Sequence, residues 1–94
     1  MSCDFQRDCS KVPFSEECLE FCIEKILRQA TIEEKINILR LNEELAHAIY
    51  KAYNGPRTIS SFNDLKLQLT SEQVQDLLNT FRNINQSQLD YFFK

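Results

Sequence analysis

The sequence predicts an all-α fold, a small single-domain bundle of four to five helices. The first observation is that one glycine and two prolines among 94 residues leave too few turn residues for a β-rich or loop-rich fold. The second is that residues favouring helices, chiefly Glu, Leu, Gln, Lys and Ile, are frequent. The third is a set of helix-start patterns along the chain. A chain of this length forms one domain, which we expect to cover residues 1–94.

The first predicted helix runs from about Glu16 to Arg28. Ser15 is a favourable capping residue, and the acidic residues after it place negative charge at the positive end of the helix dipole. The preceding residues, 1–14, are expected to form an irregular N-terminal arm.

A second and longer helix is predicted over residues 32–53. Thr31 and Glu34 match a capping box at its start, and the sequence NGP ends it, with Gly55 in the left-handed conformation. Its apolar residues cover more than half of the circumference, whereas an amphipathic surface helix needs a narrower stripe. We therefore expect this helix to be central and packed on two sides, or packed on one side and joined to a partner on the other.

The rest of the chain is predicted to hold a connecting loop and three shorter helices. The loop covers residues 54–61, and a helix follows at 62–67, where the alternating LKLQL leaves a strand open as an alternative. Thr70 begins a helix that ends near Asn83, and Asn85 caps a last short helix with several aromatic residues.

All four cysteines lie within twenty residues, at Cys3, Cys9, Cys18 and Cys22. Cys18 and Cys22 are one helical turn apart, a spacing unsuited to an unstrained disulfide between them but acceptable to a metal ion. The leading hypothesis is therefore a structural metal site that ties the arm to the first helix, most simply zinc held by four thiolates. An iron–sulfur cluster uses the same ligands and stays open.

Other states of the cysteines are open as well. Disulfides Cys3–Cys22 and Cys9–Cys18 would clasp the arm antiparallel to the helix in an oxidising compartment. Free cysteines could also pack as small hydrophobic residues, whereas a redox-active dithiol lacks its usual Cys-x-x-Cys spacing. Because the N-terminus shows no signal pattern, the sequence favours a cytoplasmic protein, in which thiols stay reduced.

Composition argues against several function classes. A single glycine leaves no glycine-rich phosphate loop, and the one histidine, His47, is expected on a helix surface without a nucleophile in register, so no enzyme is predicted. The net charge of −3 does not suit nucleic-acid binding, and a helix-turn-helix over residues 70–93 is only a minor alternative. No apolar run reaches the length of a membrane span.

The functional prediction is a small cytoplasmic, non-enzymatic protein-interaction or regulatory protein. Its partner would be another protein or a second copy of the chain, bound through the helix at 32–53 and the C-terminal aromatic residues. The alternative from another class is a sensor that depends on a metal ion or an iron–sulfur cluster held by the cysteines.

Overall fold

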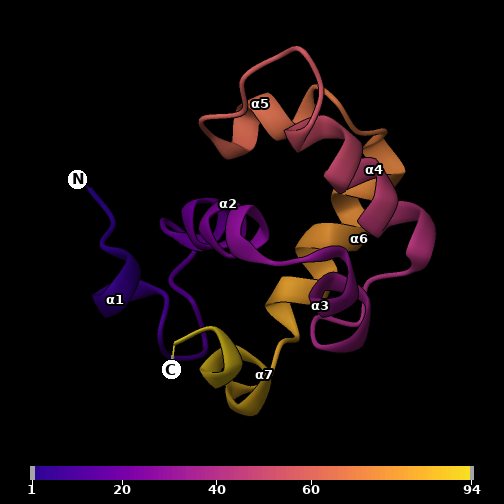
Figure 1. Cartoon of the computed structure of the whole chain (residues 1–94). Coiled ribbons are helices and arrows are strands. Elements are labelled where there is room, and N and C mark those ends of the chain that lie inside the picture. The colour runs from indigo at the N-terminus through magenta and orange to yellow at the C-terminus, as the bar shows by residue number, and fades with distance from the viewer. Residues whose placement is uncertain (1, 94) are drawn as a thin grey trace.

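Over its described residues the chain folds into seven α-helices and a terminal 3₁₀ helix, so the all-α prediction is confirmed, with more helices than expected (Figure 1). The computed structural model describes residues 2–93, so Met1 and Lys94 lie outside the described part. Within residues 2–93 there is no β-strand, and no helix is long and apolar enough to cross a membrane. The helices are α1 (Phe5–Asp8), α2 (Leu19–Gln29), α3 (Ile32–Asn37), α4 (Glu43–Tyr53), α5 (Phe62–Lys66), α6 (Ser71–Arg82) and α7 (Gln86–Asp90), followed by the 3₁₀ helix η1 (Tyr91–Phe93).

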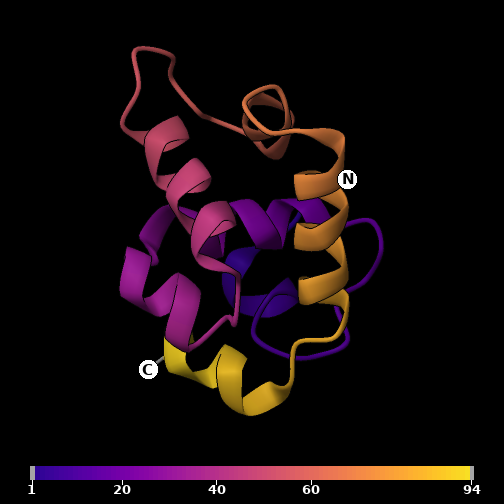
Figure 2. The ribbon, with the colours of Figure 1, turned by 90° about the vertical axis from the view of Figure 1, so that its right-hand side faces the viewer.

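Helix α2 is the central element of the fold. Figure 1 shows it in the middle of the molecule, with α5 on one side, α7 on the opposite side, and α4 and α6 together at its end. In Figure 2, α4 lies on the left and α6 on the right, and the chain joins them at their upper ends through α5. The buried residues of α2 cover most of its circumference: Leu19, Cys22, Ile23, Glu24, Ile26 and Leu27.

The start of α2 differs from the prediction. The helix begins at Leu19, and residues 15–18 form a turn in which the Cys18 amide donates a hydrogen bond of 3.0 Å to the Ser15 carbonyl oxygen. Cys18 occupies the capping position and makes no side-chain hydrogen bond there. The predicted Ser15 cap is therefore wrong, because the chain tightens into a turn before the helix begins.

The predicted helix over residues 32–53 is also wrong, because the chain turns after α3 and starts again at α4. Arg40 adopts a left-handed conformation with φ of 65°, which an α-helix does not contain. Two residues later the Asn42 side chain accepts a hydrogen bond of 2.7 Å from the Leu45 amide and so caps α4. The cysteine-free middle of the chain thus forms two short helices rather than one long one.

This break removes the unusually wide apolar face. Helix α4 buries a single stripe, made of Leu45, Ala46, Ile49 and Ala52, and its opposite side is exposed. When residues 32–53 are treated as one helix, the separate apolar stripes of α3 and α4 and the leucines of the turn fall on one wheel. The apolar face is wide only under that assignment. Helix α4 therefore gives no reason to expect a second covered side.

The second half of the chain follows its local signals closely. The loop over residues 54–61 lies between α4 and α5, and the Thr70 and Asn85 capping boxes start α6 and α7. Gly55 does not take the predicted left-handed conformation. Glycine fits there because the backbone passes close to the Lys51 carbonyl oxygen, and a Cβ atom would lie 3.1 Å from that oxygen.

The C-terminal aromatic residues dock on the chain itself. The ring of Phe93 stacks on that of Phe5 with centroids 4.6 Å apart, which joins the last residues to the arm. The Tyr91 hydroxyl donates a hydrogen bond of 2.7 Å to the Glu34 carboxylate on α3. These contacts tie the aromatic tail to the arm and to α3, although Tyr91 stays 38% exposed.

We expect Asn42→Ala to lower the free energy of unfolding by about 1 kcal/mol, because it removes the cap that starts α4. Urea denaturation followed by circular dichroism measures this. The matched control is Asn63→Ala, at an exposed position of α5 whose side chain makes no hydrogen bond within the described residues. Equal effects of the two substitutions would show that the Asn42 cap does not hold the break in place.

Candidate functional site

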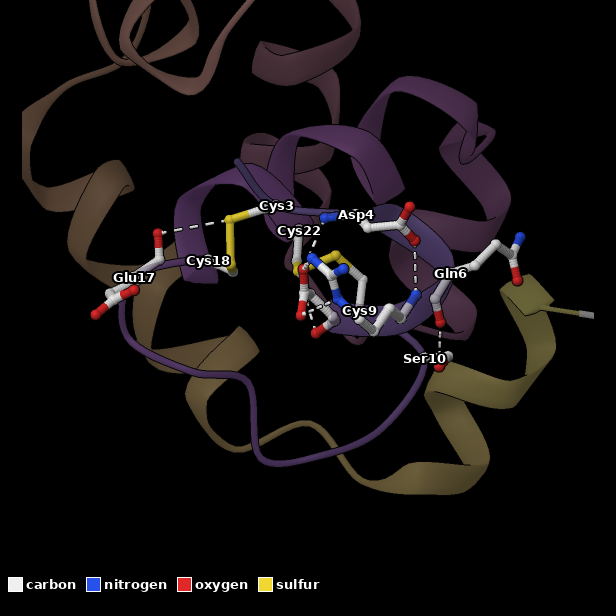
Figure 3. The surroundings of a disulfide bond; sticks show 10 residues. Cys3, Asp4, Gln6, Cys9, Ser10, Glu17, Cys18 and Cys22 are labelled. Carbon is white, nitrogen blue, oxygen red and sulfur yellow. Dashed lines mark hydrogen bonds and ion pairs between the residues drawn. A yellow bond between two sulfur atoms is a disulfide. The ribbon is translucent and has the colours of Figure 1, made fainter. Parts of the chain in front are cut away.

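The four cysteines do come together, but as two disulfide bonds (Figure 3). Cys3 is bonded to Cys18 with an S–S distance of 2.11 Å, and Cys9 to Cys22 with an S–S distance of 2.03 Å. We call this pair of bonds the clasp. It ties the arm to α2, which is the structural role that the sequence assigned to a metal ion.

The pairing predicted for the disulfide alternative is wrong. Cys3–Cys22 with Cys9–Cys18 requires an arm that runs antiparallel to α2, whereas the observed arm advances in the same direction as the helix. Helix α1 carries the chain from Cys3, which meets the start of α2, to Cys9, which meets Cys22 one turn further along. Because the intervening residues form a helix, the two arm cysteines have the separation needed to match consecutive turns of α2.

The clasp fits poorly with the predicted zinc or iron–sulfur centre. Such a centre needs thiolates, and all four sulfurs are bonded to one another in pairs. One mixed group in the described range, formed by Cys3, Asp8 and Cys18, has its ligand atoms within 4.8 Å of one another. While the disulfide is intact, however, only Asp8 can act as a ligand of the usual kind.

Asp8 is itself held by the arm. Its carboxylate accepts hydrogen bonds from the Arg7 guanidinium at 2.9 and 3.2 Å and from the Asp4 amide at 2.7 Å. The hydrogen bond from Arg7 is the main reason that the pKa of Asp8 is below its ordinary value. The carboxylate is therefore ionised and engaged in closing α1.

The inner disulfide lies in an apolar shell. Cys9 and Cys22 are fully buried, and the partly buried rings of Phe5, Phe14, Phe21 and Phe93 pack around the clasp. Cys3 is half-buried and nearer the surface. This arrangement supports a structural role for the inner bond and leaves the outer bond more accessible to reductant.

A second candidate site is a groove of about 610 Å³ that sequence reasoning missed. Its walls come from the end of α2, the start of α3 and the last turns of α4, three segments that are separated along the chain. The lining is largely apolar and aromatic, with a few charged groups: Leu27, Arg28, Ala30, Thr31, Ile32, Glu33, Lys35, Tyr50, Tyr53 and Asn54.

Two charged side chains are buried in the described part of the protein, and both lie at or next to this groove. The first, Glu24, is 2% exposed and is fully engaged. One of its carboxylate oxygens accepts hydrogen bonds of 2.9 Å from the Arg28 guanidinium and of 2.9 Å from the Tyr53 hydroxyl. Burial, together with the Glu24 carboxylate, raises the pKa of Tyr53, so its hydroxyl stays protonated and acts as a donor.

The second buried charge, Lys35, is 3% exposed and has no carboxylate partner among residues 2–93. Its ammonium group donates a hydrogen bond of 2.8 Å to the Ala30 carbonyl oxygen. Burial lowers the pKa of Lys35, and the neighbouring Glu34 opposes that effect. Glu34 itself is occupied, because its carboxylate accepts hydrogen bonds from the Thr31 amide and the Tyr91 hydroxyl.

The remaining sequence candidates lie outside these two sites. His47 is exposed on α4, as predicted. In the proposed helix-turn-helix, α7 would be the recognition helix, but its glutamines contact their own chain. Gln86 bonds to the backbone of Ser10 and Val12 in the arm, and Gln88 donates to the Ile38 carbonyl oxygen. These side chains are therefore used in folding.

Comparison with known protein families, with curated proteins and with solved structures finds no match for this chain. The function proposed below therefore rests on the geometry of the groove and the clasp.

We expect removal of the inner disulfide to cost more stability than removal of the outer one. The two bonds close loops of similar size, with sequence separations of 15 and 13, so each contributes roughly 3 kcal/mol through the unfolded state. Cys9→Ala with Cys22→Ala also leaves a buried cavity, whereas Cys3→Ala with Cys18→Ala removes a half-buried bond.

Urea denaturation of the two double variants under non-reducing conditions, in which the remaining disulfide stays intact, tests this, with each variant the control for the other. The ranking is wrong if the variant without the outer disulfide unfolds at the lower urea concentration.

Proposed function

We propose that this chain is a non-enzymatic protein-interaction domain of a regulatory kind, and that it binds a segment of a partner protein in the groove between α2, α3 and α4. The observation that carries the proposal is the groove itself. Its volume of about 610 Å³ lies in the range of natural ligand sites, and its lining combines an apolar surface with a few polar groups.

The residues at the groove are of the types that dominate binding energy at protein interfaces. Tyr50 is 46% exposed at the wall, Tyr53 lies one turn further along α4, and Arg28 faces them from α2. Tyrosine and arginine are enriched among residues that anchor a partner. The hydrogen bonds of Glu24 with Arg28 and Tyr53 hold two of these side chains in place before binding, which lowers the entropic cost of association.

The surface favours a different protein over a second copy of this chain. A stable homodimer needs a self-complementary apolar patch of considerable area. The large apolar side chains that are exposed in residues 2–93 are Tyr50, Leu67 and Tyr91, and they lie in three separate parts of the chain: on α4, just after α5, and on η1. A concave groove with one exposed aromatic at its wall fits an inserted segment better than a flat face.

The clasp also bears on where the protein works. Disulfides persist in oxidising compartments and are rare where glutathione keeps thiols reduced. We therefore propose a non-reducing compartment in place of the cytoplasm that the sequence favoured.

A selection from a random peptide display library against the oxidised protein tests the proposed function. We expect enriched peptides to shift the amide resonances of residues 27–35 and 50–54 in a ¹⁵N-HSQC titration. Tyr50→Ala should weaken their binding by at least about tenfold, as expected when an interface aromatic is lost.

The matched control is Leu67→Ala, because Leu67 is 78% exposed and lies outside the groove. Peptides that bind elsewhere, or that are affected equally by both substitutions, would contradict the proposal. If concentrated protein instead sediments as a dimer that Tyr50→Ala disrupts, the occupant is a second copy.

A metal-dependent sensor is the second candidate, and the proximity of Asp8 to Cys3 and Cys18 favours it. Reduction of each disulfide by two electrons gives two thiols, and the four sulfurs would then lie in one cluster beside a carboxylate. Thiolates and carboxylates are ligands of zinc, and an iron–sulfur cluster could use the four thiolates. In this role the working state is the reduced one.

For the sensor we expect the protein reduced with a phosphine to retain about one zinc ion after gel filtration, and the oxidised protein to retain none. Asp8→Asn should weaken zinc binding, with Asp4→Asn as the control, because Asp4 is outside the group of close ligand atoms. Reduced protein that retains neither zinc nor iron would remove this candidate.

A further inference from the structure

Lys35 is a buried charge that lacks the ion-pair partner that buried charges normally have. An ammonium group carries three donors, and one of them is used, in the bond to the Ala30 carbonyl oxygen. Within residues 2–93 no other acceptor contacts it. A buried cation without an anion is costly, whereas the other buried charge, Glu24, has two close donors.

The unpaired charge lies where a ligand could reach it. Lys35 and Ala30 both line the groove, and the hydrogen bond between them places the ammonium beside the groove wall. The aromatic rings of Tyr50 and Tyr53 and the aliphatic side chains of Leu27 and Ile32 also line it. The site thus combines a cation that lacks a counter-ion with an apolar surface for the body of a ligand.

The charges around the groove limit the kind of anion. Arg28 is paired with Glu24 at 2.9 Å, whereas Lys35 has no ion-pair partner within residues 2–93 and only the charge of the neighbouring Glu34 acts on it. Glu33 also lines the groove and would repel a doubly charged group such as a phosphate. A single negative charge that accepts hydrogen bonds, attached to an apolar group, matches this arrangement.

We infer that the groove binds a carboxylate attached to an apolar group, with Lys35 as the counter-ion and Tyr50 and Tyr53 against the apolar part. This inference rests on the proposed function, because it names the chemistry that the partner segment presents at the same site. The occupant that we assign is the C-terminal carboxylate of a partner protein next to an apolar side chain; a free aliphatic acid has the same chemistry and is the outcome that the test distinguishes from it.

The experiment titrates the oxidised full chain with two pairs of probes and follows ¹⁵N-HSQC shifts. The first pair is octanoate and octanol, and the second is acetyl-Ala-Ala-Leu with a free C-terminal carboxylate and with a C-terminal amide. We expect the acids to shift the amides of residues 27–35 and 50–54, and the neutral analogues to bind at least about tenfold more weakly.

Lys35→Met keeps the length and apolar stem of the side chain and removes the charge. It should fold, since replacing an unpaired buried charge by an apolar group relieves its desolvation, and thermal unfolding checks this. We expect it to lose at least about tenfold in affinity for the acids. Lys66→Met is the matched control, because Lys66 lies on α5, outside the groove, with Glu20 as its ion-pair partner at 3.7 Å.

The inference is overturned if neither acid binds at millimolar concentration, if the neutral analogues bind equally well, or if a folded Lys35→Met variant binds unchanged. Tighter binding of the peptide acid than of octanoate identifies a protein terminus as the source, and the reverse identifies a free acid. Selected peptides that bind the groove of Lys35→Met with unchanged affinity would support the proposed function and rule out a carboxylate as the ligand group. Octanoate binding in the groove, with no selected peptide binding there, would support the carboxylate site and remove the proposed function.

Discussion

The covalent tie between the arm and α2 is the constraint on which both ends of the chain depend. Helix α1 has no fully buried residue, and Phe5, Val12 and Phe14 of the arm are only partly buried against the core, so hydrophobic burial by itself holds the arm weakly. The arm in turn supports the C-terminal segment, through the stacking of Phe93 on Phe5 and through the bonds of Gln86 to the backbone of Ser10 and Val12. A small domain has little core to spare, and cross-links of this kind offset that shortage.

The sequence predicted those parts of the fold in which a local signal and the tertiary structure agree. The capping boxes at Thr31, Thr70 and Asn85 each start a helix where expected, because a side chain and a backbone amide three residues apart decide the start without distant contacts. The same local chemistry was present at Asn42, but the apolar residues on either side of it continued a plausible helical pattern. That pattern predicts one continuous helix, so the turn at Arg40 was not predicted.

The candidate sites, like the fold, were only partly predictable from the sequence. That the cysteines would gather was predictable from their crowding, but their pairing depended on α1, a four-residue helix with no clear signature. The groove could not be predicted from any one segment, since its walls meet only after the chain has turned back on itself. One trace of it was present, because Lys35 interrupts an otherwise apolar stripe that includes Ile32, Ile36 and Leu39.

The missed turn and the groove are one feature of the fold. Had residues 32–53 formed a single helix, the 27 Å between Lys35 and Tyr53 expected from their spacing, at about 1.5 Å per residue, would have kept them apart. Because the chain reverses at residues 38–42, α3 packs along α4, and Lys35 comes to share a groove with Tyr50 and Tyr53. The burial in that groove of a charge without an ion pair opposes folding, and the clasp at the start of α2 contributes stability that offsets it. The carboxylate that we propose for the groove would pair with Lys35 and so offset this cost.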